Sequence, residues 1–63
     1  MKHTIGVDPE LPFHEAKAEA IRILEERGDI QPGDSVRATD ETTDAHRENP
    51  DGPERVIVVR VNE

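Results

Sequence analysis

Cysteine is absent from this chain of 63 residues, and the only aromatic side chain is a single phenylalanine. Without cysteine the chain can form no disulfide, thiolate nucleophile, iron–sulfur cluster or cysteine-based zinc site. A short chain that lacks these staples is more typical of intracellular than of secreted proteins. No apolar run approaches the roughly 20 residues that span a bilayer, and residues 1–5 lack the apolar core of a signal peptide. The sequence therefore predicts a cytoplasmic protein.

Lysine is scarce as well, occurring only as Lys2 and Lys17, so arginine carries most of the positive charge. The formal net charge is −7, which repels phosphate backbones and anionic membranes and argues against both as partners. This acidic, lysine-poor composition resembles that of proteins from salt-loving archaea, in which concentrated salt screens the self-repulsion. The alternative is an ordinary acidic bacterial protein.

One dense apolar run is present, at residues 55–61 near the end of the chain. Its β-branched residues favour a packed strand over a helix. Ile57, Val59 and Val61 are expected on one face of this strand, and Val56, Val58 and Arg60 on the other. Because both faces are largely apolar, we expect this strand to be the centre of the fold.

The remaining segments divide at prolines and glycines. A first strand is predicted over residues 3–7, followed by a helix over 13–27 that Gly28 ends. A turn at 31–34 leads into a second strand at 34–39, and the last strand covers 54–61. Residues 40–53 show no apolar period and are predicted to form a long mobile loop. The helix stripe expected to face the sheet contains Phe13, Ala16, Ala20, Ile23 and Leu24.

These elements predict one small domain, residues 1–63, of the α+β class: a three-stranded mixed sheet in the order β-α-β-loop-β, with one helix packed on one face. The first two strands should run parallel to each other through a right-handed crossover. The last strand should run antiparallel to both and lie between them.

A single helix can cover only one face of such a sheet, so Val56 and Val58 are expected to be exposed on the other. Exposed apolar patches often contact partners. The predicted interaction surface therefore consists of Val56, Val58, Arg37 and Arg60, or of an open strand edge. In the alternative interpretation, the aliphatic stems of Arg37 and Arg60 lie over the valines and shield them from water.

Two histidines suggest metal binding. His3 follows Met1 and Lys2, and an amino terminus with histidine at the third position resembles a copper- and nickel-binding motif of square-planar geometry. The alternative is a histidine at a strand edge. His46 lies near Asp44 and Glu48, where a carboxylate and imidazole site competes with the simpler interpretation of a solvated loop.

No residue pattern indicates a reaction. The pairs Glu25-Glu26 and Asp40-Glu41 are typical of a hydrated surface, and Ser35 has no histidine placed to activate it. Gly28 and Gly33 end structural elements rather than forming a phosphate loop. We expect no catalytic residues and no cofactor.

Several elements of residues 13–61 together resemble a known family: the helix, Gly28, Ile30, the sequence Pro32-Gly33-Asp34-Ser35-Val36, and a final strand with Ile57, Val59 and Val61. This order resembles the end of the C-terminal domain of pyruvate kinases. The resemblance implies an α/β topology in which the second strand is central. It implies no activity, because the catalytic residues of that family lie in another domain. The acidic segment 40–53 does not match the family's Gly- and Thr-rich effector loop.

The sequence thus predicts a small, acidic, non-catalytic protein that works through protein–protein contact, with a homodimer as one form of it. The alternative is a protein that binds a metal or another small ligand through His3 or the segment around His46.

Overall fold

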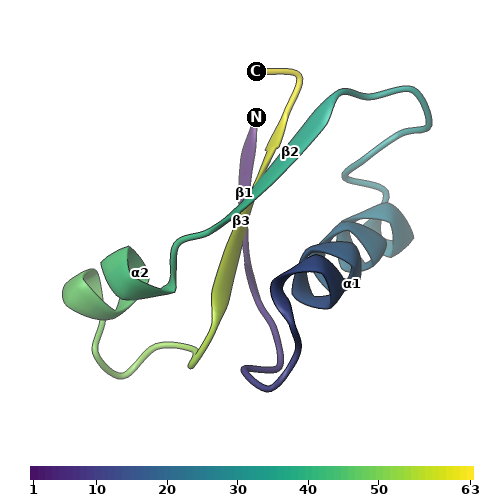
Figure 1. The fold of residues 1–63 in the computed structure, drawn as a ribbon. Helices are drawn as coiled ribbons and strands as arrows, with labels where there is room; N and C mark the ends of the chain where they lie inside the picture. The colour runs from purple at the N-terminus through teal and green to yellow at the C-terminus, as the bar shows by residue number, and fades with distance from the viewer.

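The computed structural model describes all 63 residues and shows a small α+β fold, which confirms the predicted fold class (Figure 1). Its elements in chain order are the strand β1 (Lys2–Gly6), the helix α1 (Phe13–Arg27), the strand β2 (Val36–Asp40), the helix α2 (Thr42–Glu48) and the strand β3 (Val56–Val61). The predicted helix has the bounds of α1, and the predicted strands differ from the observed ones by one or two residues at their ends.

The sheet has the strand order β1-β3-β2, so the last strand is central as its two apolar faces predicted. β3 pairs antiparallel with both neighbours. β1 and β2 run in the same direction but do not touch, so the sheet expected to be mixed is antiparallel throughout. The central position of the second strand, which the resemblance to pyruvate kinases implied, is not observed.

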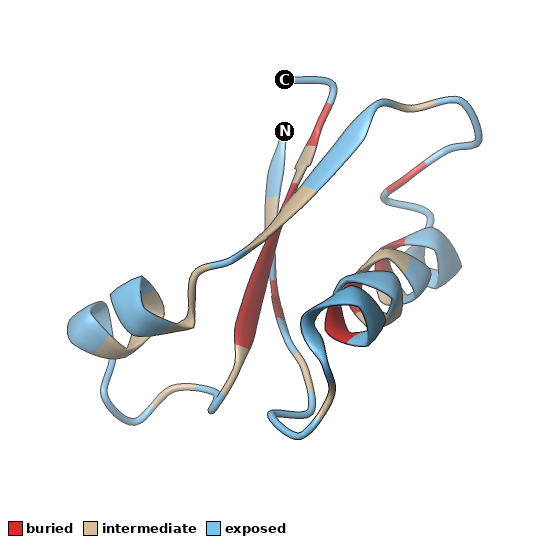
Figure 2. Cartoon of the chain, viewed as in Figure 1, coloured by how far each residue is buried: buried red, intermediate tan, exposed pale blue.

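The main core lies between α1 and one face of the sheet (Figure 2). Ile57 and Val59 are fully buried there beneath Ala20 and Leu24 of the helix. Gly28 adopts the left-handed conformation at the end of α1, where its N–H and that of Asp29 bond to the carbonyls of the last turn. This pair of hydrogen bonds around a left-handed glycine is the Schellman motif, a common way for a helix to end. Phe13 was expected in the core but is 45% exposed, because it lies at the first position of the helix.

The opposite face of the sheet carries α2, which falls within the segment 40–53 that was predicted to be a mobile loop. That prediction was wrong because it relied on an apolar period. α2 has no buried residue and follows no apolar stripe. Hydrogen bonds at its start attach it to β3 instead, and His46 near its end contacts the Pro53 carbonyl in the segment before β3. In Figure 1, α1 and α2 lie on opposite sides of the strands.

Candidate functional site

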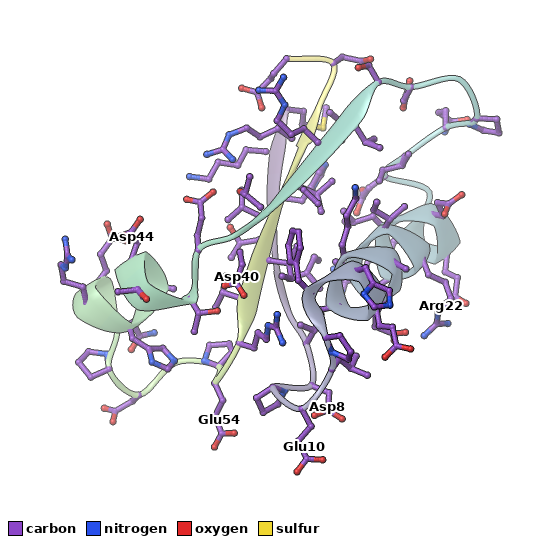
Figure 3. All side chains as sticks on the ribbon, viewed as in Figure 1. Asp8, Glu10, Arg22, Asp40, Asp44 and Glu54 are labelled. Atoms are coloured by element: carbon purple, nitrogen blue, oxygen red, sulfur yellow. The ribbon has the colours of Figure 1, made fainter.

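A shallow groove opens between α2 and the sheet, with a volume of about 280 Å3. This is just below the range of usual small-molecule sites. Its floor is formed by Val56 and Val58, and the remaining lining residues come from β1, α2 and the residue before α2: Lys2, Thr4, Glu41, Asp44, Ala45, Arg47 and Glu48. Figure 3 labels Asp44 on α2 and Asp40 at the end of β2, just before α2 begins.

The Thr42 hydroxyl attaches the start of α2 to the sheet. It accepts a hydrogen bond from the Val56 N–H at 3.0 Å and donates one to Asp40 Oδ1 at 2.6 Å. The Thr42 N–H also donates to Asp40 Oδ1, at 3.0 Å. A carboxylate that accepts from a backbone N–H two residues later is a common turn that begins helices. Asp40 and Thr42 therefore fix both the start of α2 and its contact with β3.

Arg55 connects this junction to the other side of the molecule. Its Nε donates to Asp40 Oδ2 at 3.1 Å, and its Nη1 donates to the Leu11 carbonyl in the segment before α1. The side chain of Arg55 is largely buried. One guanidinium thus ties the base of α2 to the entry of α1.

Hydrogen bonds from the Thr42 hydroxyl and N–H hold the pKa of Asp40 below its usual value, and the nearby positive charge of Arg55 lowers it further. The pKa of Glu41 is lowered as well, first by the hydrogen bond from the Thr39 hydroxyl and then by the one from Arg60. Both carboxylates are therefore held ionised. A general acid needs the opposite shift.

Near its C-terminal end, α2 makes a second contact, with the segment that precedes β3. His46 Nε2 lies 2.6 Å from the Pro53 carbonyl oxygen, so the protonated nitrogen donates to it. The Gly52 N–H donates to the Asn49 carbonyl at 2.9 Å and forms the turn between α2 and β3. Pro53 also abuts Gly6 of β1, where a Cβ atom would lie only 3.0 Å from the Pro53 Cβ.

Three cations form a row across the sheet on the α2 side. The strand register places Lys2 opposite Arg60 and Arg60 opposite Arg37. Arg60 Nη1 forms an ion pair with Glu41 Oε2 at 3.0 Å. No hydrogen bond or ion pair involves the side chains of Lys2 or Arg37. Like charges at directly opposed positions destabilise a sheet, and Glu41 is the one carboxylate that forms an ion pair with this row.

The predicted interaction surface is only partly accessible. Val56 and Val58 are 2% and 3% exposed, so the expected exposed valine patch is absent. α2, which the sequence did not reveal, lies over this face beside them. Arg37 is exposed and Arg60 is half-buried. Of the four residues, Arg37 is the one whose side chain is freely accessible.

His3 lies within β1, paired with Val59, and its Nε2 atom is buried without a hydrogen-bond partner. The Met1 amino group donates to the Val61 carbonyl at 2.8 Å. A square-planar site would need the His3 amide nitrogen as a ligand, but in this register that N–H points toward β3. The folded strand therefore does not present the amino-terminal motif to a metal.

The His46 segment does not gather metal ligands either. No three histidine, aspartate or glutamate side chains of the chain lie close enough together to hold a metal ion. His46 faces the Pro53 carbonyl instead of Asp44 or Glu48. The spacing of these residues in the sequence could not distinguish the two arrangements.

Comparison of the chain with protein-family models, curated proteins and solved structures found no match. Neither helix combines the length and apolarity needed to cross a membrane.

Replacing Thr42 with valine tests how α2 is attached. The variant leaves the Val56 N–H without its acceptor, and an orphaned buried donor costs about 1–3 kcal/mol. We expect a loss of that size in the free energy of unfolding, measured by chemical denaturation, and faster hydrogen exchange at the Val56 amide. Thr43→Val is the matched control, because Thr43 is exposed on the same helix. Equal effects of the two variants would show that the hydroxyl does not anchor α2.

Acid should weaken the same junction. The pKa of Asp40 is lower in the folded chain than its usual value. The resulting stabilisation is therefore present near neutral pH and is lost as the pH falls below about 4. We expect Asp40→Asn to be less stable than the parent at pH 7 and to lose less stability between pH 7 and pH 3. Denaturation curves across this range measure both effects. Asp51→Asn, in the turn after α2, is the control; an identical slope for Asp40→Asn and the parent would contradict the assignment.

Proposed function

We propose that this chain is a non-catalytic protein–protein interaction module, and that it joins a second copy of itself by pairing at the free edge of β2. The observation that carries the proposal is the uncovered hydrogen-bonding edge of this strand. In Figure 1, β2 crosses in front of the other strands with a helix on either side, and no segment is drawn in front of it.

The register of β2 identifies the free groups. The Asn62 N–H bonds to the Ser35 carbonyl at 2.7 Å, and the Glu41 N–H bonds to the Val56 carbonyl at 3.1 Å. In an antiparallel ladder, inward and outward groups alternate along the strand. The N–H and C=O groups of Val36, Ala38 and Asp40 therefore point away from β3. Such groups are a template for pairing with another strand.

The β2 edge is less protected than the β1 edge. β1 carries a lysine at its start and a glycine at its end, against which Pro53 packs. Lysine and nearby proline are features that discourage pairing at an edge. β2 contains no proline or glycine, and Val36 is an exposed apolar residue on its edge.

The groups that could perform a reaction are instead used to hold the fold. Asp40 and Glu41 are kept ionised by hydrogen bonds, and the His46 ring contacts the Pro53 carbonyl. These contacts support a structural role for the acidic and imidazole side chains. The cytoplasmic location inferred from composition remains a prediction.

Ala38→Pro tests the proposal. Proline is tolerated at an edge where the N–H faces outward, but it removes the donor needed for pairing. We expect the parent chain to reach dimer mass as its concentration rises in molar salt, and Ala38→Pro to remain a monomer with an unchanged circular dichroism spectrum. Sedimentation equilibrium measures the masses.

Thr4→Pro is the matched control, because the register places the Thr4 N–H at the outer edge of β1. We expect this variant to dimerise as the parent does. A parent chain that stays monomeric at every concentration would overturn the proposal. So would a folded Ala38→Pro variant that associates like the parent, or loss of association only in Thr4→Pro.

A further inference from the structure

The charges along β2 differ between its two ends. Arg37 is the second residue of the strand, and Glu41 directly follows its last residue, Asp40. Arg37 and Glu41 lie on the α2 side of the sheet, since Arg37 is opposite Arg60 and Glu41 forms an ion pair with Arg60. A strand that is positive at its start and negative at its end is complementary to a copy of itself running in the opposite direction.

Arg37, like Lys2, has no hydrogen-bond or ion-pair partner for its side chain. It is exposed, it stands beside Arg60, and Lys2 stands on the other side of Arg60. The carboxylate in contact with this row is Glu41, through its Oε2 atom, which also accepts from the Thr39 hydroxyl at 2.7 Å. No hydrogen bond involves the Oε1 atom of Glu41, so that oxygen can accept another donor.

We infer that the two copies pair through β2 in the register that places Arg37 opposite Glu41 of the second copy, so that this charge pair selects both the partner and the register. The inference rests on the proposed function, and it specifies which residues make the edge prefer its own copy over other extended chains. Because the contact is two-fold symmetric, the Arg37–Glu41 pair occurs twice in the dimer.

The free backbone groups are compatible with this register. With Arg37 opposite Glu41 of the second copy, Thr39 faces Thr39 on the two-fold axis, and Ala38 faces Asp40. Ala38 and Asp40 both carry outward N–H and C=O groups, so they can exchange a pair of hydrogen bonds. Arg37 and Glu41 then form a pair without backbone bonds between them, in which the side chains approach most closely.

Competing registers lack this match. Sliding one copy by two residues puts Arg37 opposite Thr39, and sliding it by four puts Arg37 opposite Arg37 of the second copy, where like charges repel.

A two-fold axis perpendicular to the sheet also keeps both α1 helices on one face and both α2 helices on the other. The groove beside α2 is lined by residues of β1, α2 and β3 and by Glu41, so it meets the joined edge at Glu41 only.

The test exchanges charges between two variants, Arg37→Glu and Glu41→Arg. Alone, each variant places like charges opposite each other at both ends of the contact, and we expect its self-association to weaken at least about tenfold relative to the parent. In an equimolar mixture each pair is again of opposite sign. We expect heterodimers with an affinity within a few-fold of the parent, measured by native mass spectrometry and sedimentation equilibrium, with circular dichroism as the check on folding.

The double variant Arg37→Glu/Glu41→Arg provides a second test, because it restores both pairs within a single species and should dimerise alone. It also carries the test if Glu41→Arg alone does not fold, because the added Arg37→Glu change places a carboxylate directly opposite Arg60 in exchange for the lost contact. Single variants that dimerise like the parent, or a mixture and a folded double variant that both stay monomeric, would overturn the register. If Ala38→Pro still abolishes dimerisation in that case, the proposed edge contact stands and the charge pairing fails. A monomeric parent chain contradicts both.

Discussion

Burial of β3 on both of its faces is the constraint from which the rest of the structure follows. Five of its six residues are buried, and it lies between the other two strands. A strand that is apolar on both sides must be covered twice. α1 supplies one cover with an apolar stripe. α2 supplies the other with no buried side chain; it is held by hydrogen bonds to β3 at its start and to the segment before β3 near its end.

The difference between these covers explains what could be predicted from the sequence. α1 has helix-forming residues, a periodic stripe and a glycine at its end, so its bounds could be read directly. The central position of β3 followed from its unbroken run of β-branched residues. α2 gives no such pattern, because Ala45 is its one apolar residue. A retrospective signal is the Asp40-x-Thr42 spacing, which is typical of a turn that begins a helix.

The candidate site could not be predicted for the same reason. Val56 and Val58 were expected to be exposed because no cover for them could be recognised. The long-range contacts of Arg55 with Asp40 and the Leu11 carbonyl join segments that are distant in the chain, and spacing alone carries no information about them. Arg37 was predicted to be part of the interaction surface around the two valines, and the shelter that its stem could give them was the alternative interpretation. In the structure its importance is different, because it is an exposed charge at the free edge of the sheet.

A three-stranded sheet that carries a helix on each face keeps two outer strand edges, here those of β1 and β2. The edge of β2 combines free backbone groups with an unpaired Arg37 and a carboxylate at the opposite end. The association that we propose uses one of these edges, because the helices on the two faces of the sheet cover β3.

Native-state hydrogen exchange of the β3 amides tests this account most directly. The Val59 N–H points toward β1 and the Val58 N–H toward β2. If β3 is the shared centre of one cooperative structure, both amides should exchange only through global unfolding, with the same free energy of opening and the same dependence on denaturant. The account would be contradicted if the Val58 amide exchanged through a separate opening of lower free energy while the Val59 amide stayed protected. That result would show that β2 and α2 are attached to a core that is stable without them.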